Sequence, residues 1–144
     1  MDKKVLCATD GSHASMKAVA YSVDLAHRLK IPLTFLVVHP VEEGSVMDPV
    51  RSWDGNIMDA VDWQVHKDLV DAQSVAKKAG LTQITLAAVG SHNIPEAIVK
   101  YASAHEIEHI VVGSTGRSEV AKLLLGSVAS RVVSLAHCPV TVVR

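Results

Sequence analysis

The sequence lacks an excess of charge of either sign. Its 144 residues carry 14 lysines and arginines against 15 aspartates and glutamates, and no run of like charges stands out. Proteins that attract nucleic acid or an anionic membrane surface usually display a strongly basic patch or run. We therefore expect neither nucleic acid nor an anionic membrane surface among the partners.

The N-terminal segment lacks a long apolar run. Two lysines and only five apolar residues precede the turn at Asp10. This is shorter than the apolar region of a signal peptide and far shorter than a membrane-spanning helix. We expect a cytoplasmic protein that does not insert into a membrane.

Cysteine is scarce, and the two cysteines present are isolated. Cys7 falls within a predicted strand and Cys138 directly precedes Pro139, so neither forms a C-x-x-C pair. In a reducing compartment such cysteines most often act as small buried hydrophobes. We assign no chemistry to them.

Two widespread nucleotide-binding motifs are absent. The chain contains neither a G-x-x-x-x-G-K-[ST] loop nor a G-x-G-x-x-G fingerprint. Strong ATPase and dehydrogenase chemistry are therefore unsupported. The spacing of the residues also defines no Ser-His-Asp or Cys-His catalytic grouping.

What the chain does contain is an alternation of apolar strands and amphipathic helices. The predicted strands, which lack polar alternation as strands buried on both faces do, cover residues 5–9, 33–38, 84–89, 109–112 and 140–143. The predicted helices cover residues 13–29, 57–78, 95–105 and 127–136. Ser12 or Ser15 caps the first helix, and prolines and glycines make residues 39–56 a long loop. This order predicts a single α/β domain over residues 1–144, a parallel sheet sandwiched between two helical layers.

The stretch 108–129 combines a strand, a glycine-bearing loop and the start of a helix. Its glycines and serine follow the pattern G, two residues, G, nine residues, G, S, at Gly113, Gly116, Gly126 and Ser127. Glycines let backbone amides approach an anion closely, and the first amides of a helix are electropositive. Taken singly, these residues also suit an ordinary turn and a helix N-cap. Taken together, they predict an anion-binding site.

The complete pattern matches the nucleotide motif of the universal stress protein family, in the branch that binds ATP. The segments KKVLCATDGS, HIVVGSTG and HCPVTVVR also resemble that family's first, fourth and last strands. The resemblance thus covers nearly the whole chain. It implies a universal stress protein domain with a five-stranded parallel sheet in the order 3-2-1-4-5, of the adenine nucleotide alpha hydrolase-like type.

The resemblance also implies roles for individual residues. Asp10 and Val38 would contact the adenosine part of ATP. The phosphates would be held by Gly113, Ser114, Gly116, Gly126, Ser127 and Val128, and Mg²⁺ suits the phosphate oxygens. Around Gly90 the chain reads GSHNIPEAI, longer than the family's usual span, which puts the ribose-side contacts in question. Valine at Gly113 or Gly126 is expected to block the phosphates while the fold survives.

The segment HEIEH, residues 105–109, satisfies the H-E-x-x-H pattern of zinc metalloproteases. That motif requires a continuous helix through both histidines. His109 instead begins the β-branched run IVVG, so we predict a helix end that turns into a strand, and no zinc site. The other histidines show no ligand spacing.

The resemblance favours a cytoplasmic stress-response protein in which ATP acts as a regulatory ligand for shape or for the choice of an unidentified regulatory protein partner. One alternative is a slow ATPase or autophosphorylating enzyme on the same site, and another is a nucleotide-free interaction module. The short apolar strand at residues 139–144 would lie at the sheet edge in the family's order. An open edge invites pairing with a second chain, and relatives commonly dimerise there, so we expect a homodimer.

Overall fold

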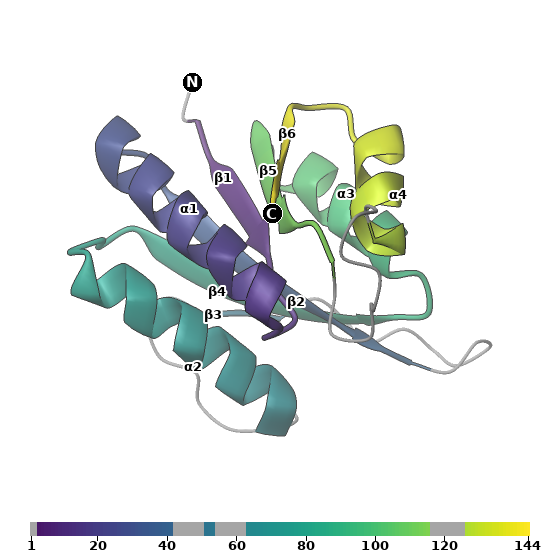
Figure 1. Cartoon of the computed structure of the whole chain (residues 1–144), viewed down its shortest axis with the longest axis horizontal. Helices are drawn as coiled ribbons and strands as arrows, with labels where there is room; N and C mark the ends of the chain where they lie inside the picture. Colours follow the sequence, from purple (N-terminus) through teal and green to yellow (C-terminus); the bar gives the residue numbers. More distant parts are fainter. Residues whose placement is uncertain (1–2, 42–50, 54–62, 116–125) are drawn as a thin grey trace.

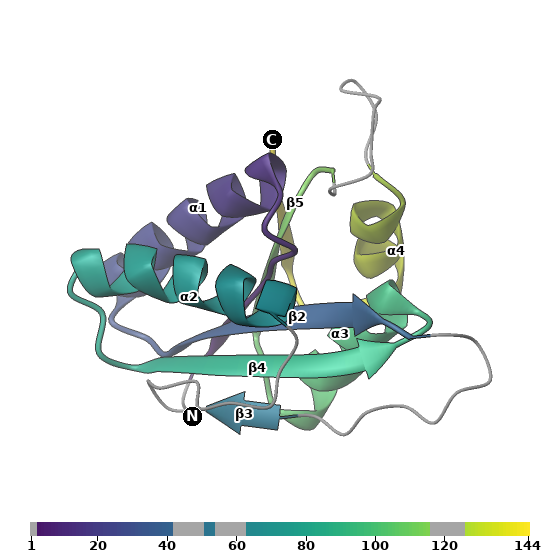
Figure 2. The same ribbon diagram turned by 90° about the horizontal axis from the view of Figure 1, so that it is seen from below.

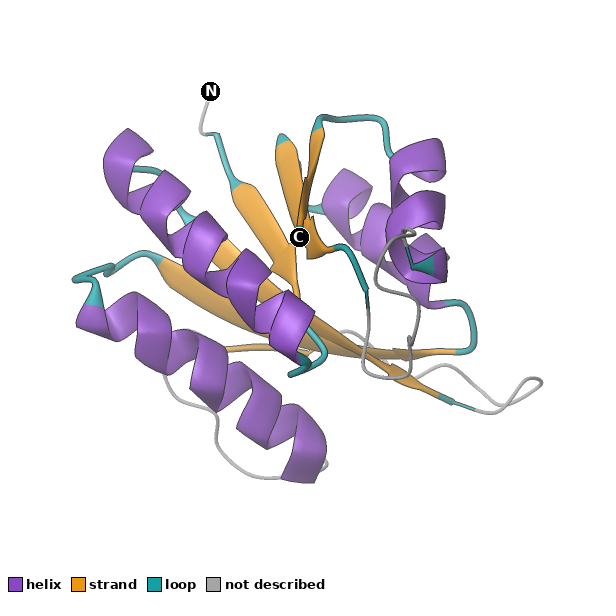
Figure 3. Cartoon of the chain, in the orientation of Figure 1, coloured by secondary structure: helices purple, strands orange, loops and turns teal. Residues whose placement is uncertain are grey.

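The computed structural model describes residues 3–41, 51–53, 63–115 and 126–144. Within these residues, six strands form one sheet and four helices cover it (Figures 1 and 3). The strands are β1 (Val5–Ala8), β2 (Leu33–Pro40), β3 (Arg51–Trp53), β4 (Ile84–Ser91), β5 (His109–Gly113) and β6 (Val140–Val143). The helices are α1 (His13–Leu29), α2 (Trp63–Lys78), α3 (Ile94–Ala104) and α4 (Ser127–Leu135).

The sheet has the order β3-β4-β2-β1-β5-β6. Strands β4, β2, β1, β5 and β6 are all parallel to one another. Numbered by their order in the sequence without β3, these five strands stand in the sheet in the order 3-2-1-4-5. This confirms the predicted five-stranded parallel sheet and its order. The order places β1 in the middle, between β2 and β5.

The prediction of one long loop over residues 39–56 is wrong at two points. His39 and Pro40 extend β2, because the register with β4 continues as far as the pair Pro40 and Ser91. Arg51–Trp53 form β3, which lies antiparallel against β4. The edge of β4 would otherwise present unpaired backbone groups, and the returning chain satisfies them. Residues 42–50 and 54–56, and the predicted helical residues 57–62, lie outside the described residues.

Helices α1 and α2 cover one face of the sheet, and α3 and α4 cover the other (Figure 2). One apolar cluster lies on each face. Successive side chains of a strand point to opposite faces, so Val5 and Cys7 of β1 join the cluster under α1 and α2, whereas Leu6 joins the cluster under α3 and α4. The same division holds in β5, where Val111 faces α1 and Ile110 faces α3 and α4. This explains the uninterrupted apolar strands of the sequence.

The helix ends follow the signals in the sequence. Of the two candidate caps of α1, Ser12 is the one used, because its hydroxyl accepts a hydrogen bond from the Ser15 amide at 3.2 Å. Gly80 follows α2 in the left-handed conformation, with φ of +87°. Asn93 caps α3 ahead of Pro95. None of the helices in the described part of the chain is long and apolar enough to cross a membrane.

The two cysteines differ in their surroundings. Cys7 is fully buried in β1, and burial raises the pKa of its thiol to about 12. Cys138 is half-buried beside β6, and burial raises the pKa of its thiol as well. A thiol reacts as the thiolate, so Cys7 behaves as a small core hydrophobe, as predicted.

His109 links the last two strands and makes stability depend on pH. Its Nε2 lies 2.7 Å from the Thr141 hydroxyl of β6, and burial lowers the pKa of the ring from 6.5. The folded state therefore disfavours the protonated ring, and the unfolded chain binds more protons as the pH falls through and below 6.5. This contribution is fully present above that pH and is lost toward acid.

We expect the His109→Gln variant to lose less stability than the wild type between pH 7 and pH 5. Glutamine keeps a hydrogen-bonding side chain but does not titrate. Urea unfolding at a series of pH values measures the two slopes. Parallel slopes would show that another group governs the acid loss.

Candidate functional site

The site predicted from the sequence lies where the order of the sheet reverses. The chain leaves β1 for its neighbour β2 and later returns on the other side of β1 as β5, where Cys7 pairs with Val111 (Figure 1). In open α/β sheets, ligands bind at such a reversal, outside the carboxyl ends of the strands. Asp10 follows the carboxyl end of β1 and Gly113 ends β5, so both lie at this edge.

The turn after β1 holds the half-buried Asp10 in a defined position. Its Oδ1 accepts a hydrogen bond from the Ser12 amide at 2.9 Å, and Gly11 adopts the left-handed conformation with φ of +78°. The Gly11 amide in turn donates to the Thr9 hydroxyl at 3.2 Å. A carboxylate fixed in this way can accept hydrogen bonds from a ribose hydroxyl or an exocyclic amine.

Val38 lies toward the carboxyl end of β2, opposite Val89 of β4, and its side chain packs with the cluster under α3 and α4. The Thr9 amide donates to the Leu36 carbonyl at 2.9 Å, so the end of β1 runs beside this part of β2. Val38 and Asp10 thus both lie toward the carboxyl ends of their strands, β2 and β1.

The two halves of the glycine motif meet at Ser114. Its carbonyl accepts a hydrogen bond from the Gly126 amide at 2.7 Å, which joins the residue after β5 to the residue before α4. The amides of Ser127 and Val128 open α4, and the first amides of a helix carry partial positive charge. Gly116 and residues 117–125, also part of the motif, lie outside the described residues.

The Ser114 amide itself is committed to the fold. It donates to the Val143 carbonyl of β6 at 2.8 Å. A contact from Ser114 to a phosphate would therefore use its hydroxyl rather than its amide. The assignments of Asp10, Val38 and the phosphate residues stay predictions.

Gly113 serves packing in a way that the sequence did not reveal. Its φ is not positive, but a Cβ added to it would lie 2.8 Å from the carbonyl carbon and oxygen of Ala14 and 2.9 Å from the Ser15 amide nitrogen. The missing side chain admits the first turn of α1 to the end of β5. The expectation that valine at Gly113 leaves the fold intact is therefore wrong, because the backbone of α1 occupies the space.

The segment after Gly90 closes on itself. Buried Ser91 accepts a hydrogen bond from the Asn93 amide at 3.0 Å and donates to the Asn93 carbonyl at 3.1 Å. The Asn93 side chain accepts from the Glu96 amide at 3.2 Å and thereby starts α3. The longer span thus forms the cap of a helix at the carboxyl end of β4.

Sequence reasoning missed two hydroxyls, those of Thr9 and Ser15, that contact the turn containing Asp10. Thr9 and Ser15 are buried, and their hydroxyl oxygens lie 3.1 Å apart. The sequence does hold a signal, since Ser12 and Ser15 stand three residues apart at a helix start where one serine suffices as a cap. The second serine is then free to serve another group.

The histidines of HEIEH do not converge. Helix α3 ends at Ala104, and the His105 Nδ1 lies 2.9 Å from the Tyr101 carbonyl oxygen, whereas His109 belongs to β5 and contacts Thr141. The continuous helix that the zinc motif requires is not formed. Across the part of the chain that the structure describes, no three His, Cys, Asp or Glu residues group as ligands for a metal ion.

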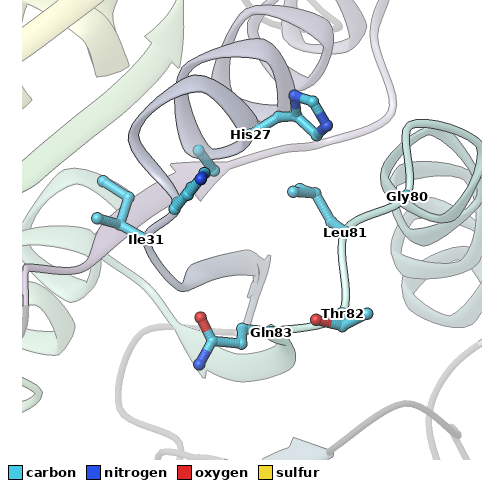
Figure 4. A pocket seen from close by; sticks show the side chains of 8 residues that line it. His27, Ile31, Gly80, Leu81, Thr82 and Gln83 are labelled. Carbon is cyan, nitrogen blue, oxygen red and sulfur yellow. The ribbon is translucent and has the colours of Figure 1, made fainter.

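A separate pocket of about 240 Å³ lies near the amino ends of β2 and β4 (Figure 4). It is lined by the segments that precede β2 and β4, including His27, Ile31, Gly80, Leu81, Thr82 and Gln83. These segments lead into the amino ends of the strands, so the pocket lies at the opposite end of the strands from Asp10 and Gly113. No predicted site residue lines it.

A comparison with models of known protein families identifies the family of this chain. A model of the universal stress protein family matches residues 1–144. The chain belongs to the universal stress protein family. A universal stress protein of Bacillus subtilis is 32% identical over 150 aligned positions, with 100% of each chain covered. One from Methanocaldococcus jannaschii is 30% identical over 143 positions, which cover 99% of this chain and 82% of that protein.

A solved structure of another family member is also similar. It is a universal stress protein in complex with cAMP, with a TM-score of 0.72 and 26% identity over 99% of this chain and 97% of that chain. The α/β fold with its reversal between β1 and β5 is therefore the fold of this family.

Replacing Gly113 by alanine should destabilise the fold, because the new methyl group meets the backbone of α1. We expect a loss of about 1–3 kcal/mol, the usual cost of overpacking a close contact. Urea unfolding measures it. Gly80→Ala is the matched control: nothing lies within 4 Å of a Cβ at Gly80, so its cost comes from the positive φ alone. Wild-type stability of Gly113→Ala would contradict the close contact.

Proposed function

We propose that this universal stress protein binds an adenine nucleotide, ATP in the first place, at the carboxyl ends of β1 and β5. The observation that carries the proposal is the hydrogen bond from Gly126 to Ser114, which sets the amino end of α4 beside the end of β5. A carboxylate held at β1 and an electropositive helix end beside β5 are complementary to the two ends of a nucleotide. The cAMP complex of the relative at 26% identity supports an adenine nucleotide.

In the proposed site, β1 with β2 and β5 with α4 would contact different parts of the ligand. Asp10 and the backbone beside Val38 would face the adenosine, and the residues from Gly126 to Val128 would face the phosphates. The site residues in the described ranges offer one carboxylate, Asp10, so Mg²⁺ would be carried chiefly by phosphate oxygens. We infer that the nucleotide acts as a regulatory ligand in a stress response. The cytoplasmic location expected from the N-terminal sequence stays a prediction.

Saturating ATP with Mg²⁺ should raise the melting temperature. A ligand at about a hundred times its dissociation constant adds roughly 2.7 kcal/mol, which shifts the midpoint of a domain of this size by several degrees. Differential scanning calorimetry with and without nucleotide measures the shift. An unmoved midpoint would refute ATP binding.

The Gly126→Val variant locates the phosphates. Gly126 has φ of −65° and ψ of 161°, which any residue can adopt, so valine introduces no backbone strain there. Its methyl groups stand at the start of α4, where phosphate oxygens are expected. The variant should still fold, as a cooperative melt without ATP would show, and give no ATP-induced shift. Wild-type ATP affinity in this variant would mean that the phosphates lie elsewhere.

We further propose that two copies pair through β6. This strand is the last of the sheet on its side, and all four of its residues are partly exposed. The Pro139 carbonyl accepts a hydrogen bond from the Ile110 amide of β5 at 3.0 Å, and the Val143 carbonyl accepts one from the amide of Ser114, the residue after β5, at 2.8 Å. Successive residues turn their backbone groups to opposite sides, so the amide of Val142 points to the open edge.

The Val142→Pro variant should be a folded monomer. Proline removes an amide that faces the open edge and leaves the hydrogen bonds with β5 in place. Light scattering coupled to size exclusion measures the mass. Val142→Ala is the matched control, since it shortens the same side chain but keeps the amide, and it should remain a dimer. A dimeric Val142→Pro, or a monomeric wild type at micromolar concentration, would contradict pairing through β6.

A further inference from the structure

We propose that Ser15 is a positioning residue for the nucleotide site, which acts through Asp10. The inference rests on the proposed nucleotide binding and adds to it the residue that holds the carboxylate in place. Ser15 lies in the first turn of α1 and is buried, with 4% of its surface exposed. It is not the cap of that helix, because Ser12 fills the role.

The Ser15 hydroxyl has three polar neighbours. Its oxygen lies 3.1 Å from the Ser12 carbonyl oxygen, 3.1 Å from the Thr9 hydroxyl oxygen and 3.4 Å from the Asp10 amide nitrogen. A serine hydroxyl donates one hydrogen bond and accepts two. Three neighbours therefore use its full capacity.

The direction of each hydrogen bond follows from this count. Ser15 donates its one proton to the Ser12 carbonyl, so the Thr9 hydroxyl must donate to Ser15. The Thr9 oxygen in turn accepts from the Gly11 amide at 3.2 Å. A single chain of bonds thus runs from the Gly11 amide through Thr9 and Ser15 to Ser12.

These hydrogen bonds surround the turn that contains Asp10. The Asp10 amide donates to Ser15, while the Asp10 carboxylate accepts from the Ser12 amide. The amide and the carboxylate of Asp10 are therefore both hydrogen-bonded to residues at the start of α1. Because Thr9 and Ser15 are buried, water cannot readily replace a lost partner, and the turn would have to rearrange.

Ser15 also lies close to the end of β5, which carries the phosphate side of the proposed site. Its amide nitrogen lies 2.9 Å from the place that a Cβ would take on Gly113. The same residue thus holds Asp10 with its side chain and lies against the end of β5 with its backbone. The side chain can be removed without disturbing the backbone contact, which makes its contribution separable.

The experiment compares Ser15→Ala with Ser22→Ala in the full-length protein. Ser22 is the matched control: it lies in the same helix, is fully buried, and its hydroxyl donates to the Val19 carbonyl at 2.9 Å, away from the turn. Each variant loses one buried hydroxyl, so both should lose stability in urea unfolding. Titration calorimetry should show ATP affinity weakened about fivefold to tenfold in Ser15→Ala alone, the effect of roughly one hydrogen bond.

Two further measurements test whether the effect passes through Asp10. The weakening should be the same for AMP as for ATP, since Asp10 lies on the adenosine side. In an Asp10→Ala background, Ser15→Ala should cause no further loss of ATP affinity. A loss confined to ATP, or full additivity of the two substitutions, would overturn the inference.

If Ser15→Ala does not fold, Thr9→Val carries the same test, because it cuts the chain of hydrogen bonds one step earlier. ATP affinity equal to that of the wild type in a folded Ser15→Ala or Thr9→Val protein, or an equal loss in Ser22→Ala, would overturn the inference and leave the nucleotide site standing. A wild-type protein that binds neither ATP nor AMP would overturn both.

Discussion

The contact between the first turn of α1 and the end of β5 is the constraint on which the site depends. Helix α1 begins directly after the turn that carries Asp10, and β5 leads directly into the glycine motif. Only a residue without a side chain leaves room for the Ala14 carbonyl at this point. Close packing of backbone on backbone therefore sets the distance between the Asp10 turn and the end of β5, because tightly packed groups have little freedom to shift.

Around this contact, apolar side chains form the two faces of the sheet and polar groups gather at the carboxyl ends of the strands. The five parallel strands carry apolar side chains on both faces, and these side chains pack in the two apolar clusters. The polar groups at its carboxyl edge are mostly hydroxyls and backbone amides rather than charges, which costs less free energy in a half-buried place. Within the described ranges, every buried side-chain nitrogen or oxygen has a hydrogen-bond partner. The described hydroxyls at the carboxyl ends of β1 and β4 are therefore held by hydrogen bonds within the fold.

Sequence reasoning reached the architecture because periodicity and resemblance pointed the same way. The bounds of α1 and β6 agree with the prediction to the residue, since each is closed by residues that cannot continue it, such as Pro32 after α1 and Pro139 before β6. Strand β3 was missed, because three residues flanked by glycine and proline carry no period, and only the open edge of β4 gives them a structure.

The site was predicted in its outline but not in its internal contacts. The glycine spacing indicated which segments approach one another, and the structure joins two of them through Ser114 and Gly126. The role of Gly113 against α1 and the hydroxyl pair of Thr9 and Ser15 depend on neighbours distant in sequence or on the choice between two serines. Such contacts are decided by tertiary packing, which local patterns do not encode.

The unequal burial of the two cysteines gives the protein a built-in place for a probe. A maleimide dye or spin label reacts with a thiolate that it can reach, so it would spare Cys7 inside β1 and react with the half-buried Cys138, more slowly than with a fully exposed thiol because burial raises the pKa of Cys138 as well. Cys138 stands two residues before β6. Without any engineering, one label could thus be attached beside the open edge of the sheet, where its spectrum would report on whatever chain lies there.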